Sequence, residues 1–181
     1  MDADWSVEIG PELPVIDGSW EGFVDLRSWP GAIGNVEEAR EYPALRDALL
    51  TLNGAGSAVF TTKCDAWTIP GGEIDPDEFG AAGETARVGF ASYIDVLEHD
   101  VARFQSFEFH EQRAREIAKA LRSVDLRGAR VDMVVRRAHL SETSGAGLTL
   151  YVAGCGKNDA DALTAWQTAL RAAIAATMST A

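Results

Sequence analysis

The chain has 181 residues, of which 46% are hydrophobic and 24% are charged; this composition predicts one folded domain and excludes intrinsic disorder. The formal net charge of −12 makes nucleic acid a poor partner, because an acidic protein repels the phosphate backbone. No apolar run reaches the roughly 20 residues of a membrane-spanning helix, and the acidic N-terminus lacks the pattern of a secretory signal. We therefore expect a cytoplasmic protein without a membrane partner.

The first half of the chain predicts a strand, a helix and two further strands. Residues 1–18 contain Gly and Pro without a period, which predicts an irregular N-terminal segment. In residues 19–27 side chains alternate in the manner of a strand with one buried face. The following elements are a helix that begins near Glu41 and ends at Gly54, strands over 57–64 and 86–97, and an acidic, turn-rich loop over 70–80.

The second half predicts a similar series. Its elements are a short strand over 104–109, a helix over 110–122, a hairpin of strands over 130–139 and 147–153, and a last helix from Asn158 to about Met178. Together these elements predict an α+β fold with a mainly antiparallel sheet and helices on one face. The element order also suggests a duplicated β-α-β-β plan within one domain over 19–181, with halves 19–100 and 101–181.

The few cysteines and histidines limit the chemistry that the chain can perform. Cys64 follows Lys63 where a strand enters the acidic loop, and Cys155 lies between a strand end and a helix start, where a thiolate is favoured. Cys155 is a candidate nucleophile with His110 or His139 as its base, and Cys64 is another because the neighbouring Lys63 can lower the pKa of its thiol. The alternative is that Cys64 is a small core residue in phase with Phe60 and that Cys155 occupies a tight turn.

The same residues give little support for a metal site or a cofactor site. The histidines and cysteines have no metal-ligand spacing, and the acidic loop breaks the calcium-loop pattern at Pro76. The glycines around Cys155 have neither the phosphate-loop nor the dinucleotide-binding spacing. We therefore expect neither a metal nor another cofactor.

A candidate ligand site comes from the outward-facing residues of the predicted hairpin. Alternation places Arg136 on the face opposite Val131 and Val135, and Tyr151 of the paired strand shares that face. Such a face is either an ordinary solvent-exposed sheet surface or the floor of a site for a small anion. The full candidate set is Arg136, His139, Tyr151, Cys155, Trp67 and Cys64.

Three hypotheses about function follow from these patterns. The first is a binding or interaction module that uses an open sheet face or cleft for a small ligand, or its acidic surface over 65–84 for a basic protein. The second is a small cysteine-dependent enzyme that uses Cys155 or Cys64 with a histidine base. The third is a homodimer in which another copy covers the second sheet face.

Overall fold

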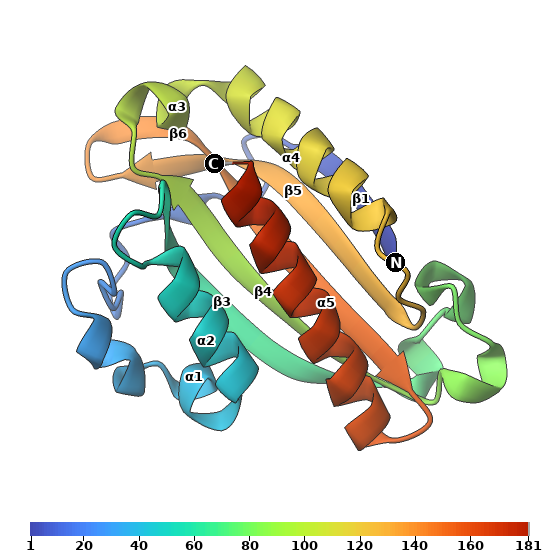
Figure 1. The fold of residues 1–181 in the computed structure, drawn as a ribbon. Coiled ribbons are helices and arrows are strands. Elements are labelled where there is room, and N and C mark those ends of the chain that lie inside the picture. Colours follow the sequence, from blue (N-terminus) through green and yellow to red (C-terminus); the bar gives the residue numbers. More distant parts are fainter. Residues whose placement is uncertain (181) are drawn as a thin grey trace.

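The computed structural model describes residues 1–180, which form a sheet covered by helices (Figure 1). This arrangement confirms the α+β class. The strands are β1 (Asp2–Glu8), β2 (Ile16–Asp17), β3 (Val59–Pro70), β4 (Val88–Glu98), β5 (Ala129–Leu140) and β6 (Thr143–Gly156). The α-helices are α1 (Glu37–Glu41), α2 (Pro43–Leu52), α3 (Val101–Gln105), α4 (Phe107–Arg122) and α5 (Asp159–Ser179), and the short 3-10 helices are Pro30–Asn35, Gly71–Glu73, Pro76–Phe79 and Gly83–Thr85.

The sheet is mixed rather than antiparallel throughout. Its strand order is β1-β5-β6-β4-β3, and β2 also pairs with β5. The three pairings among β3, β4, β6 and β5 run antiparallel, whereas β1 and β2 lie parallel to β5. The N-terminal segment is therefore not irregular throughout, because residues 2–8 form an edge strand. Its alternation of acids with Ala3, Trp5 and Val7 places Ala3 and Trp5 against the helices and the acids on the other face.

Two predicted strands are absent, and with them the proposed β-α-β-β order of each half. Residues 19–27 form turns, in which Gly22 has a φ of 100° that a strand does not permit. Residues 104–109 end α3 and begin α4, because the Ser106 hydroxyl accepts a hydrogen bond from the backbone N–H of Phe109 and caps the helix. The duplicated plan therefore finds no confirmation in the element order.

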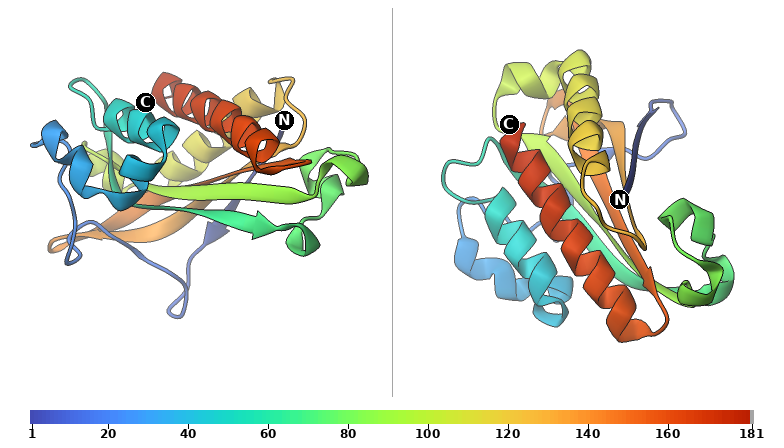
Figure 2. Two further views of the ribbon diagram at one scale, coloured as in Figure 1. Left: turned by 90° about the horizontal axis from the view of Figure 1, so that it is seen from below. Right: turned by 45° about the vertical axis from the view of Figure 1, so that its right-hand side comes forward.

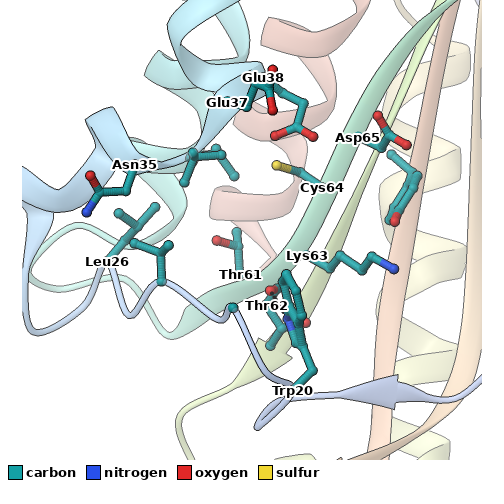
Figure 3. A pocket seen from close by; sticks show the side chains of 15 residues that line it. Trp20, Leu26, Asn35, Glu37, Glu38, Thr61, Thr62, Lys63, Cys64 and Asp65 are labelled. Carbon is teal, nitrogen blue, oxygen red and sulfur yellow. Dashed lines mark hydrogen bonds between the residues drawn. The ribbon is translucent and has the colours of Figure 1, made fainter.

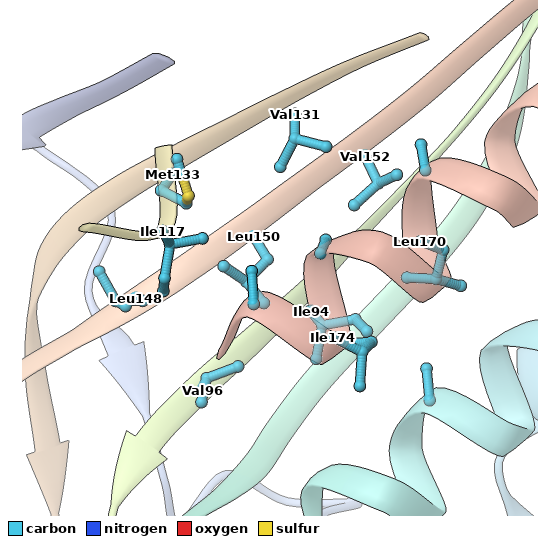
Figure 4. Packing of buried hydrophobic residues seen from close by; sticks show 14 of the residues in the cluster. Ile94, Val96, Ile117, Val131, Met133, Leu148, Leu150, Val152, Leu170 and Ile174 are labelled. Carbon is cyan, nitrogen blue, oxygen red and sulfur yellow. The ribbon is translucent and has the colours of Figure 1, made fainter. Parts of the chain in front are cut away.

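One face of the sheet carries the main core. Helices α2, α4 and α5 lie on this face, as Figure 2 shows. The core fills the space between them with branched side chains from alternate strand positions, including Ile94, Val131, Leu150 and Val152 (Figure 4). Helix α5 approaches β6 closely at Gly154, where a Cβ atom would lie 2.8 Å from the carbonyl oxygen of Ala162. No helix within residues 1–180 is long and apolar enough to cross a membrane.

Within residues 1–180, the second face of the sheet is covered mainly near its two ends. Near one end, Ile16 from the N-terminal segment packs on Phe60, Leu97 and Ala138. At the other end, Phe79 and Ala86 from the loop over 71–87 pack on Cys155. The N-terminal segment is visible beneath the sheet in the left panel of Figure 2. A strip of sheet between these two covered ends carries polar and aromatic side chains.

Candidate functional site

The candidate site is a cavity of about 360 Å³ on the second face of the sheet. Strand alternation supplies its floor, because odd-numbered residues of β4 and β6 and even-numbered residues of β5 point away from the helices. The N-terminal segment forms one side of it. The lining residues are Pro14, Val15, Ile16, Asp17, Trp20, Lys63, Tyr93, Asp95, Arg136 and Tyr151.

Arg136 is tied to its neighbours through nearly all of its donors. Its Nε and Nη2 atoms donate to Glu8 Oε2 at 3.1 and 2.7 Å, and Nη1 donates to Tyr151 Oη at 3.1 Å and Thr149 Oγ1 at 3.3 Å. The guanidinium also lies 5.5 Å from the centre of the Tyr151 ring. The Glu8 carboxylate neutralises Arg136, so this side chain holds Tyr151 in place rather than offering a free cation.

Asp95 is the buried acid of the site. Its Oδ1 atom accepts a hydrogen bond of 2.6 Å from Thr149 Oγ1, and only 8% of the residue is exposed. Burial raises the pKa of this carboxyl, although the Thr149 hydrogen bond and the charges of Arg136 and Lys63 act in the opposite direction. Within residues 1–180, no cation lies within 4.0 Å of Asp95, and Oδ2 accepts no hydrogen bond.

Aromatic rings extend from the cavity along the sheet. The Tyr93 ring lies 5.9 Å from the Tyr151 ring and 6.3 Å from the Trp67 ring. Trp67 and Tyr151 also line a neighbouring cavity of about 320 Å³ that continues toward Phe79. Burial, together with the charge of Asp95, raises the pKa of the Tyr93 phenol, so this group stays protonated. The strip thus offers flat apolar surface beside a buried carboxylate.

Cys64 lies on the other face of the sheet from these rings. A bulge between Thr61 and Lys63 adds one residue to β3, so Cys64 packs on the helix side, whereas Phe60 faces the opposite side. The predicted common phase of Phe60 and Cys64 is therefore wrong. Cys64 lines a cavity of about 270 Å³ beneath Glu37 and Glu38 of α1 (Figure 3). Burial, with the charges of Glu38, Asp65 and Asp95, raises the pKa of its thiol to about 12.

Cys155 and the histidines lie apart from one another. Cys155 packs under the loop over 71–87, and burial raises the pKa of its thiol. His139 is near the opposite end of β6, where its Nδ1 atom lies 3.1 Å from Ser144 Oγ. His110 is buried in α4, and this burial lowers its pKa to about 4. The structure brings neither His139 nor His110 to the Cys155 thiol.

We expect both thiols to react slowly with iodoacetamide at neutral pH. A pKa near 12 leaves Cys64 with about a thousandfold less thiolate than an ordinary cysteine, and the thiolate is the species that reacts. Mass spectrometry of timed samples would measure the rate, with the urea-unfolded chain as the reference. Modification of the folded chain as fast as the unfolded one would show that the thiols are activated.

Of the six candidate residues, the structure gathers Arg136, Tyr151 and Trp67 on one open strip of the sheet. Cys155 and His139 lie elsewhere, and Cys64 lines a separate cavity on the helix side that shares Trp20, Lys63 and Tyr93 with the candidate site. The sequence analysis did not single out Asp95 or Tyr93, although the alternation in residues 86–97 places both away from the core, and it considered Lys63 only as the neighbour of Cys64. The sequence did not indicate that Trp20 lines the site, since its position depends on how the N-terminal segment folds back across the sheet.

Comparison with known proteins gave no relative: no family, no curated protein and no solved structure matches this chain.

Proposed function

We propose that the protein is a binding module that holds a small molecule on the open strip of its sheet. The observation that carries this proposal is the buried carboxylate of Asp95 at the base of a cavity with fixed walls. A sheet surface that only meets water does not need to bury an acid, because a buried charge is unfavourable unless an opposite charge lies beside it, and the partner of Asp95 is the neutral hydroxyl of Thr149. A bound ligand supplies such a partner.

The pre-formed shape of the cavity supports the same proposal. Arg136 fixes the Tyr151 ring, and the Nε1 atom of Trp20 donates a hydrogen bond of 2.9 Å to the carbonyl of Thr62. Ligand sites are usually concave, mostly formed before binding, and lined by aromatic groups with a few placed polar atoms. The raised pKa values of Cys64 and Cys155 argue against the cysteine-dependent enzyme.

A fragment screen by NMR tests this proposal. We expect fragments to shift the amide signals of Tyr93, Asp95 and Tyr151, and we expect Tyr93→Ala to weaken the same fragments by about tenfold, since one wall of the cavity is lost. Trp29→Ala is the control, because Trp29 is 73% exposed and lies outside the cavity. Fragments that shift only signals of the helical face, or a screen with no hits, would contradict the proposal.

A further inference from the structure

The charges and rings of the cavity define the class of ligand, an inference that rests on the proposed function. We propose that the cavity binds a small organic cation of the ammonium type, with Asp95 as its counter-ion and with Trp20, Tyr93 and Tyr151 as its walls. Three observations carry this assignment: the unpartnered oxygen of Asp95, the rings around it, and the neutralised state of Arg136.

Asp95 provides a directed negative charge. Its Oδ1 atom is fixed by Thr149, which is fully buried, so the carboxylate plane cannot turn freely. The Oδ2 atom accepts no hydrogen bond from residues 1–180, and Asp95 lines the cavity. A buried carboxylate with one free oxygen gains most from a positively charged donor, because charge-assisted hydrogen bonds are about twice as strong as neutral ones.

The rings suit a cation rather than a neutral ligand. Tyr93 and Tyr151 lie 5.9 Å apart with a tilt of 47°, and Trp20 is held beside the same cavity by its hydrogen bond to Thr62. Aromatic faces attract ammonium groups, and several rings around a carboxylate form the usual receptor for methylated amines. A cation already lies near one of these rings, since the Lys63 ammonium is 5.9 Å from the centre of the Trp20 ring.

An anionic ligand, which was one of the two interpretations of this face in the sequence analysis, fits less well. Arg136 is neutralised by Glu8 and uses four hydrogen bonds on Glu8, Thr149 and Tyr151. Lys63 is then the cation left to meet an anion, whereas Asp95 and Asp17 would both repel it. A cationic ligand would instead be attracted by Asp95 and Asp17 and repelled by Lys63. This reversal makes Lys63 a useful site for a test.

Calorimetric titration with choline tests the assignment. The matched probes are 3,3-dimethylbutan-1-ol, which has the shape of choline without its charge, and 3,3-dimethylbutanoate, which carries a negative charge. We expect choline to bind at least about tenfold more tightly than either probe, because the cation–π and charge interactions act on choline alone. Equal affinity for choline and the alcohol would overturn the assignment.

Two variants test which residues cause the preference for choline over the other two probes. We expect Asp95→Asn to weaken the binding of choline by about tenfold or more and to leave the affinity for the neutral alcohol unchanged. The reason is that the amide keeps the hydrogen bond with Thr149 but loses the negative charge. We expect Lys63→Gln to raise the affinity for choline several-fold, since this substitution removes a cation that repels the ligand. Retained binding in Asp95→Asn, or weaker binding in Lys63→Gln, would overturn the assignment.

Failure of this assignment and failure of the proposed function give different results. If fragments shift Tyr93 and Tyr151 while choline does not bind, the site remains and its ligand is not a cation. If neither choline nor any fragment binds at this strip, both inferences fall. Circular dichroism of each variant shows whether it is folded, so that loss of binding is not confused with loss of structure.

Discussion

Replacing Arg113 with methionine should lower the free energy of unfolding by about 3–5 kcal/mol, the usual cost of breaking a buried ion pair. Arg113 of α4 pairs with Glu98 at the end of β4, and their side chains are only 2% and 1% exposed. Arg113 Nη2 also donates a hydrogen bond of 2.9 Å to the carbonyl of Thr177 in α5. The pair therefore connects the sheet to two helices, and its loss leaves the Glu98 carboxylate buried without a partner. Urea unfolding followed by circular dichroism measures the change.

A control and a rescue make this prediction specific. Arg115→Met is the control on the same helix, because Arg115 is half exposed and its ion pair with Glu111 should contribute less than about 1 kcal/mol. In the double variant Glu98→Leu with Arg113→Met, no buried charge remains, so most of the lost stability should return. A single variant that loses less than the Arg115 control would show that the pair does not stabilise the fold.

The sequence predicted the elements whose side chains carry a strong period. The last helix was expected over 158–178 and is found over Asp159–Ser179, and the helix over 110–122 begins three residues earlier than expected. Both have apolar residues at helical spacing and a capping side chain at the start: Asn158 Oδ1 accepts from the N–H of Asp161, and Ser106 caps α4. Local signals of this kind are sufficient for helices.

The sequence was a poor guide where the partner of a segment is distant in the chain. Residues 2–8 were expected to be irregular, yet they form β1 because the start of β5 offers an unpaired edge more than 100 residues later. Residues 19–27 show a two-residue alternation, but Trp20 and Leu26 contact separate parts of the molecule. Pairing between distant segments decides these cases, and a local period contains no information about it.

The candidate site was predictable to a similar extent. Arg136 and Tyr151 could be placed on one face by alternation within a hairpin, and the register of β5 with β6 puts both on the open side. Cys64 was misplaced because the bulge in β3 shifts the alternation by one residue. Asp95 could be placed on this face, but its burial depends on the N-terminal segment that folds across it. Burial, rather than face, is what distinguishes a site from a solvent-exposed surface.

Replacing Trp166 with alanine should destabilise the protein by about 3–5 kcal/mol, because it leaves a large cavity in the core. Trp166 is fully buried, and its ring centre lies 4.7 Å from Phe90. Its Nε1 atom donates a hydrogen bond of 2.9 Å to Ser92 Oγ, which is also fully buried. Urea unfolding measures the loss, and Trp29→Ala, at an exposed site, should change stability by less than about 0.5 kcal/mol.

A milder variant, Trp166→Phe, tests whether packing of the core affects ligand binding at the candidate site. It removes the hydrogen bond to Ser92 and should cost about 1–3 kcal/mol, since the buried hydroxyl loses its partner. Ser92 and Tyr93 are consecutive in β4 and point to opposite faces, so this substitution alters the helix side and leaves the cavity side in place. Trp166→Phe should therefore lower stability while its affinity for choline stays the same. A parallel loss of affinity would show that α5 packing, and not the sheet alone, sets the geometry of the cavity.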